Sequence, residues 1–120
     1  MDKFTGKIKY INVNELSASE CNCLVAFIKT LKKFGVPSLL YKFANYCDYG
    51  ICFFYDNKKW ISYMCENGEI CNKNEYKDIK EMIIYAFNEY FPYYENNEYK
   101  LINSFNTELK NFEKDKGLEL

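Results

Sequence analysis

Residues 51–71, ICFFYDNKKWISYMCENGEIC, decide the fold. The aromatic and β-branched runs at 51–55 and 60–65 are typical of strands. Asn67-Gly68 is the strongest short hairpin signal, because a type I′ turn needs positive φ at both of its central residues. Residues 56–59 are expected to form a second, four-residue hairpin loop. This stretch therefore predicts an antiparallel meander.

The Asn67-Gly68 turn also predicts the register of its hairpin. Glu66 and Glu69 then flank the turn, so two carboxylates are expected at an exposed tip. Two other segments are expected to be strands: residues 39–43 for their apolar content, and residues 7–13 for a loose alternation.

Three segments with helical periodicity surround the predicted strands. Residues 17–20, Ser-Ala-Ser-Glu, have capping-box spacing and open a helix over about 18–34. The 3.6-residue period returns over 75–91, with acidic residues opposite an apolar side. A last helix is expected over about 97–115.

The length of 120 residues suits one domain with one core. We therefore predict a single α+β domain over residues 1–120. Its architecture is an antiparallel β-meander of three to four strands packed against an N-terminal helix and two C-terminal helices.

The composition excludes several common kinds of catalytic site. All 16 basic residues are lysines, and the chain contains neither arginine nor histidine. Without histidine there is no Ser-His-Asp or Cys-His nucleophile pair, and without arginine there is no bidentate fork for phosphate. The scattered glycines form no phosphate-binding loop. We therefore expect a chain that is not an enzyme and takes no cofactor.

Six cysteines are an even number, which would suit disulfides in a secreted protein. The first residues lack the apolar stretch of a signal peptide, and no run is long enough to span a bilayer, so we expect a soluble, cytoplasmic protein with free, mostly buried thiols. The cysteine spacings also differ from the CxxC knuckle of a zinc ribbon, so no metal site is expected. The cysteines stand at positions 21, 23, 47, 52, 65 and 71.

Charge is distributed unevenly along the chain. The formal net charge is −1, so bulk attraction to nucleic acid or to an anionic membrane is not expected. Residues 1–59 carry nine lysines and five acids, whereas residues 60–99 carry three lysines and eight acids. The asymmetry is consistent with ordinary solvated faces, and also with a partner of opposite charge.

Tyrosines and carboxylates alternate through the acidic part of the chain. Tyrosine offers rigid, amphipathic contact area, and flanking carboxylates complement a basic partner. The alternative is that Tyr93 and Tyr94 only cover the core where two helices meet. The candidate partner-binding residues are Glu81, Tyr85, Glu89, Tyr93, Tyr94 and Glu95.

A family resemblance rests on four stretches of the chain. These are Ile51-Cys-Phe-Phe-Tyr55, Trp60-Ile-Ser-Tyr63, Glu66-Asn-Gly68 and an amphipathic helix over 77–90. The pattern covers about a third of the chain and resembles small cytosolic immunity proteins of bacterial polymorphic-toxin systems. In that family a Glu-Arg-Gly turn commonly follows the tryptophan strand, and here Asn67 stands in the place of that arginine.

The resemblance implies a stoichiometric inhibitor that binds a cognate toxin and blocks its active site or substrate channel. The expected partner is a basic protein, such as a toxin or nuclease, with no direct contact to nucleic acid or membrane. A phage-encoded inhibitor of a host defence nuclease would be the same kind of molecule with another target. An alternative of another class is a small enzyme or metal-binding module.

Overall fold

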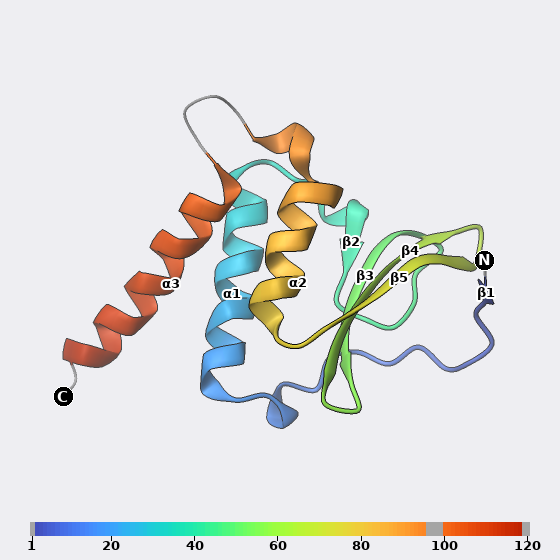
Figure 1. The fold of residues 1–120 in the computed structure, drawn as a ribbon, viewed down its shortest axis with the longest axis horizontal. Coiled ribbons are helices and arrows are strands. Elements are labelled where there is room, and N and C mark those ends of the chain that lie inside the picture. Colours follow the sequence, from blue (N-terminus) through green and yellow to red (C-terminus); the bar gives the residue numbers. More distant parts are fainter. Residues whose placement is uncertain (1, 96–99, 119–120) are drawn as a thin grey trace. The chain divides into compact units, whose positions relative to one another are not determined.

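The computed structural model describes residues 2–95 and 100–118, and the side chains within 4–95 and 100–112 (Figure 1). It contains helices and a mixed β-sheet, so the predicted α+β class is confirmed. Within the described residues, no helix combines the length and apolar character that a membrane crossing requires.

The chain divides into two compact units. The sheet unit comprises Met1–Asn12 and Pro37–Met82, and the helical unit comprises Val13–Val36 and Ile83–Leu120. The single-domain organisation and the packing of the meander against helices stay predictions.

The sheet unit contains a five-stranded sheet in the order β1-β5-β4-β3-β2. Its centre is the predicted antiparallel meander of β3 (Tyr49–Asp56), β4 (Lys59–Glu66) and β5 (Glu69–Tyr76). At the two edges, β1 (Asp2–Lys3) pairs antiparallel with β5 and β2 (Tyr41–Lys42) pairs parallel with β3. The meander is therefore confirmed, and short edge strands extend it into a mixed sheet.

The hairpin between β4 and β5 has the predicted turn and register. Asn67 and Gly68 have φ angles of 52° and 79°, as a type I′ turn requires, and Glu66 pairs with Glu69. Glu66 is exposed and Glu69 is half-buried, and the backbone of β1 pairs beside Glu69. Both carboxylates therefore flank the turn as predicted, with Glu66 exposed and Glu69 half-buried.

The hairpin between β3 and β4 is tighter than predicted. Asp56 pairs with Lys59, which leaves only Asn57 and Lys58 in the turn. These two residues have φ angles of 50° and 63°. The expected four-residue loop is in fact a second type I′ turn, in which a lysine occupies the position that usually belongs to glycine.

The strand expected over residues 7–13 is not formed. Only Tyr10 pairs with the neighbouring segment, in an isolated bridge to Ala44. The side-chain oxygen of Asn45 accepts the Lys9 N–H at 2.6 Å, and its nitrogen donates to the Lys7 carbonyl at 3.3 Å. A side chain thus satisfies backbone groups that a ladder would otherwise pair.

The strand expected over residues 39–43 is shortened to β2. The segment Ser38–Leu40 forms a 3-10 turn, in which the Leu40 N–H donates to the Pro37 carbonyl at 3.0 Å. Proline fixes φ near the value that this kind of turn needs, so the chain enters the sheet late.

In the helical unit, α1 spans Ala18–Lys33 and confirms the first predicted helix. Ser17 Oγ accepts the Glu20 N–H at 3.1 Å, and Glu20 Oε1 accepts the Ser17 N–H at 2.9 Å, which completes the capping box. Gly35 has a φ of 77°, so the chain reverses and Val36 N–H reaches a carbonyl of the last helical turn.

The helix expected over residues 75–91 begins later than predicted. Strand β5 continues to Tyr76, because Tyr76 pairs with Trp60 and its hydroxyl lies 2.8 Å from Ser62 Oγ. The helix α2 then spans Ile79–Tyr85, and a π-helical turn follows over Ala86–Tyr90. Ladder pairing thus outweighs the helical period at the start of this segment.

The last helix, α3, spans Leu101–Leu118 and extends beyond the predicted end at 115. Its predicted start at 97 lies outside the described residues. Three buried rings form the core of the helical unit: Phe27 of α1 lies 5.4 Å from Phe87 in an edge contact, and Phe87 lies 6.1 Å from Phe105 of α3.

Candidate functional site

The six residues expected to bind a partner fall in both units. Glu81 belongs to the sheet unit, whereas the other five belong to the helical unit. Both units therefore contribute to the set, and the helical unit holds most of it. The tyrosine segment, defined as residues 85–94, contains four of the six.

Glu81 has a structural task at the start of α2. Its Oε2 accepts the Lys77 N–H at 3.1 Å, and its own N–H donates to Asp78 Oδ1 at 3.0 Å. The bond to Asp78 satisfies one of the amides that a helix leaves unpaired at its N-terminus, and the bond from Lys77 ties down the residue just before the helix start. Glu81 is exposed and charged, yet its carboxylate is engaged within the chain.

Glu95 has a similar role before α3. Its Oε1 accepts the Leu101 N–H at 3.1 Å, and its Oε2 lies 3.8 Å from Lys100 Nζ. Its side chain is only 21% exposed. The sequence pattern counted this carboxylate as a binding group, but its contacts hold the first turn of a helix.

The tyrosine segment contains both anchored and exposed side chains. The ring of Tyr85 contacts that of Tyr90 edge-on at 5.4 Å, and the ring of Tyr94 contacts Phe91 at 6.4 Å. Glu89 is exposed, and Tyr93 is 94% exposed. Of the large hydrophobic side chains exposed in the described part of the chain, Tyr93 has the highest exposed fraction.

The expectation that Tyr93 and Tyr94 cover a core holds only in part. Phe91 is fully buried, and the half-buried Tyr94 packs beside it. Tyr93, its neighbour along the chain, has almost its entire side chain in solvent. Both residues lie in the 3-10 turn Pro92–Tyr94, which directs one ring into solvent and the other toward Phe91.

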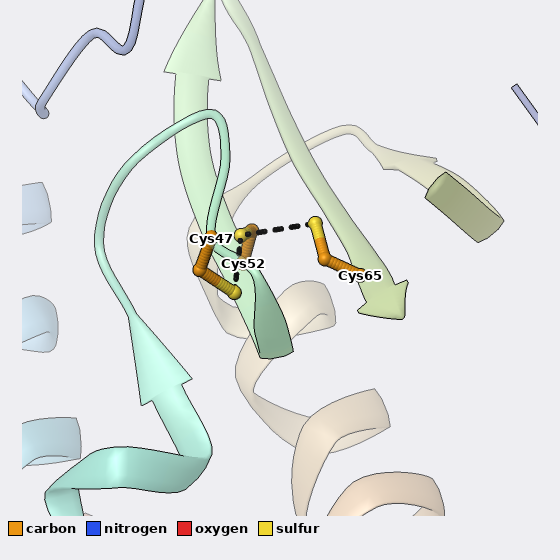
Figure 2. A group of neighbouring side chains, drawn as sticks. All are labelled: Cys47, Cys52 and Cys65. Carbon is orange, nitrogen blue, oxygen red and sulfur yellow. Dashed lines mark hydrogen bonds between the residues drawn. The ribbon is translucent and has the colours of Figure 1, made fainter. Parts of the chain in front are cut away.

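A second cluster of functional groups lies in the sheet unit. Figure 2 shows the sulfur atoms of Cys47, Cys52 and Cys65 facing one another. Cys52 Sγ is 3.4 Å from Cys47 Sγ and 3.7 Å from Cys65 Sγ, and all three sulfurs lie within 4.8 Å of one another. We call these three residues the thiol cluster.

Three different segments bring the thiol cluster together. Cys52 lies on β3 and Cys65 on β4, while Cys47 lies in the connection between β2 and β3. In the ladder Cys52 pairs with Tyr63 and Gly50 pairs with Cys65, so the two strand cysteines are diagonal neighbours on one face of the sheet.

The surroundings of the thiol cluster are apolar and well packed. Cys52 and Cys65 are buried together with Ile61 and Tyr63, and Cys47 is half-buried at the edge of this group. The Tyr63 hydroxyl donates to the carbonyl of Asn45. Burial raises the pKa of the Cys47 and Cys52 thiols, so both groups are held in their protonated form.

No two of the six cysteines, all of which lie in the described part of the chain, are joined by a disulfide. Cys23, Cys52 and Cys65 are buried and the other three are half-buried. The expectation of mostly buried thiols thus holds for three of the six. The convergence of three of them was missed, because their spacing along the chain matches no short metal-binding motif.

Comparison of the chain with protein-family models, with curated proteins and with solved structures finds no match in any of the three.

Proposed function

We propose that the chain is a non-catalytic inhibitor of the immunity-protein kind, which neutralises a basic bacterial toxin by stoichiometric binding. The observation that carries this proposal is the 94% exposure of Tyr93, on a turn whose neighbouring rings are packed. The resemblance of residues 51–55, 60–63 and 66–68 to immunity proteins points to the same function.

The exposed ring is held on a preorganised support. An almost fully exposed tyrosine buries too little surface to contribute much to folding. The turn that carries Tyr93 is anchored by the buried Phe91 and by Tyr94, whose ring contacts it. A preformed aromatic anchor loses little conformational entropy on binding and is typical of interface hot spots.

The charge of this part of the chain suits a basic partner. Residues 60–99 hold eight acids and three lysines, and Glu89 of the tyrosine segment is exposed. Carboxylates at the rim of an interface accelerate association with a cationic protein, and salt screens the effect. Glu81 and Glu95 are hydrogen-bonded at the starts of helices. Of the three candidate carboxylates, Glu89 is therefore the one best placed to attract a partner.

The first test is capture of the partner from the native host by the tagged chain, at low and then at moderate salt. The captured protein is then expressed in a bacterial host with and without this chain. We expect one stoichiometric basic protein whose toxicity the chain neutralises. A captured defence nuclease would instead identify the phage-encoded alternative, and failure of the folded chain to capture any protein would contradict the proposal.

Two variants locate the binding surface. Glu89→Lys with Tyr93→Ala removes one exposed acid and one exposed ring from the tyrosine segment. The matched control, Glu15→Lys with Tyr10→Ala, makes the same chemical changes at exposed residues elsewhere. We expect the first double variant to lose protection against the toxin, and the control to keep it.

A further inference from the structure

We propose that Cys47, Cys52 and Cys65 form a site for a thiophilic metal ion, Cu(I) or Zn(II), with one thiolate ligand from each residue. This site is separate from the tyrosine segment, and its function does not depend on the inhibitor proposal. It lies entirely within the sheet unit.

The separations between the sulfur atoms suit a shared ion. Zinc–thiolate bonds are about 2.3 Å long, so two sulfurs on one tetrahedral zinc are about 3.8 Å apart. Cys52 Sγ stands 3.4 Å from Cys47 Sγ and 3.7 Å from Cys65 Sγ. The third pair, Cys47 Sγ and Cys65 Sγ, lies within 4.8 Å, so a movement of at most about 1 Å would bring all three sulfurs onto one ion.

The kind of donor selects the kind of ion. Three sulfur ligands favour soft or borderline cations such as Cu(I) and Zn(II) over Mg²⁺ or Ca²⁺, which prefer oxygen. Within the described residues, these three cysteines form the one group of side chains whose ligand atoms lie close enough together to share a metal ion. Cu(I) is satisfied by three thiolates, whereas Zn(II) would take a water as its fourth ligand.

The fold supplies both a rigid base and a route of entry. Cys52 and Cys65 lie on adjacent strands and are 0% and 3% exposed, so the ladder holds two ligands in place. Ile61, Tyr63 and Ile70 pack around them on the same face of the sheet. Cys47 is half-buried in a connection, where an ion can first bind from solvent.

Binding is an exchange of protons for a metal ion. Each S–H bond breaks as its sulfur joins the ion, so up to three protons pass to the buffer, and no electron is transferred. The ion must therefore be supplied in its final oxidation state. For copper this means Cu(I), presented under anaerobic conditions.

The test titrates the full, reduced chain with Zn(II) against a chromophoric chelator and, separately, with Cu(I) against a Cu(I)-selective chelator. Cd(II) serves as a spectroscopic probe, because thiolate coordination produces a ligand-to-metal charge-transfer band. We expect one equivalent of metal to bind in at least one titration, with that band for Cd(II). The titration that reaches saturation at one equivalent identifies the ion that the site binds.

Two variants tie any binding to the cluster. Cys47→Ser removes the half-buried ligand and leaves both strand cysteines in place, and circular dichroism checks that the variant is folded. Loss of one ligand should weaken metal binding by more than about 100-fold. Even the substitution of a residue that only supports a ligand lowers metal affinity by about 10–100-fold. The matched control, Cys21→Ser with Cys71→Ser, replaces two half-buried cysteines outside the cluster and should leave binding unchanged.

Stoichiometric binding that Cys47→Ser abolishes and the control retains supports the site. No binding of either ion to the folded wild-type chain would overturn the proposal. Binding that survives Cys47→Ser, or that only the control variant loses, would overturn it as well.

Discussion

The sheet unit and the helical unit place their functional groups in opposite ways. In the sheet unit the polarisable groups face inward, so that Cys52, Cys65 and Tyr63 are buried together. In the helical unit the core is made of phenylalanine rings, and a tyrosine stands in solvent at Tyr93. The inward arrangement suits a small ligand such as a metal ion, and the outward arrangement suits a protein.

The largest expected effect tests the core of the helical unit. Phe87 is 1% exposed and contacts the rings of both Phe27 and Phe105. Phe87→Ala should lower the free energy of unfolding by about 3–5 kcal/mol, because it removes a ring from between two others. Denaturant unfolding measures the loss, and hydrogen exchange should localise it to α1 and α3. A loss below about 1 kcal/mol would mean that this ring cluster is not the core.

The next effect compares the two type I′ turns of the sheet unit. At Gly68 a Cβ would stand 2.9 Å from the Tyr46 hydroxyl, and φ is positive, so Gly68→Lys should cost about 1–2 kcal/mol. Lys58 has a φ of 63°, so the reverse change, Lys58→Gly, removes the left-handed penalty at the cost of glycine's extra backbone entropy and should stabilise the chain by about 0.5–1 kcal/mol. Thermal or denaturant unfolding of both variants measures these changes in stability. If both substitutions changed the stability by the same amount in the same direction, the turn assignment would be contradicted.

A smaller effect concerns the buried hydroxyl of Tyr63. Burial raises the pKa of Tyr63 above its ordinary value of 10.0, and the neutral phenol donates to the Asn45 carbonyl. A folded-state pKa above the unfolded value means that stability is lost as the pH rises above about 10. Tyr63→Phe should lower stability by about 0.5–1.5 kcal/mol at neutral pH and flatten its alkaline decline. Stability is measured by urea unfolding at several pH values. If the wild type and Tyr63→Phe lost stability in parallel as the pH rises, Tyr63 would not titrate in this way.

The smallest effect on stability is expected at the most exposed ring. Tyr93→Ala should change the free energy of unfolding by no more than about 0.5 kcal/mol, because the side chain is 94% exposed. Tyr94→Ala should cost more, because its half-buried ring contacts Phe91. Equal losses from the two substitutions would show that Tyr93 is also a structural residue.

Features set by neighbouring residues could be predicted from the sequence. The Ser17–Glu20 capping box and the Asn67-Gly68 turn each need only a few adjacent positions, and both are present. The periodicity at residues 75–76 predicts a helix, but these residues belong to β5. Its pairing with β4 depends on a partner strand, which a local pattern does not contain.

The candidate sites show the same limit. The thiol cluster joins Cys47, Cys52 and Cys65 through a connection and a ladder, so only the strand register reveals it. The charge pattern predicts an acidic surface that includes Glu81 and Glu95, but their hydrogen bonds to backbone amides depend on where the helices start. Charge patterns locate carboxylates along a chain without showing which of them cap helices.

The most direct test of the inhibitor function is the affinity of purified variants for the captured toxin, measured by calorimetry at two salt concentrations. Glu89→Lys with Tyr93→Ala should weaken binding by at least about tenfold, as expected for loss of a hot-spot ring and its steering charge, and should reduce the salt dependence. The control Glu15→Lys with Tyr10→Ala should bind like the wild type. Unchanged affinity of the first variant, or equal losses in both, would contradict the account.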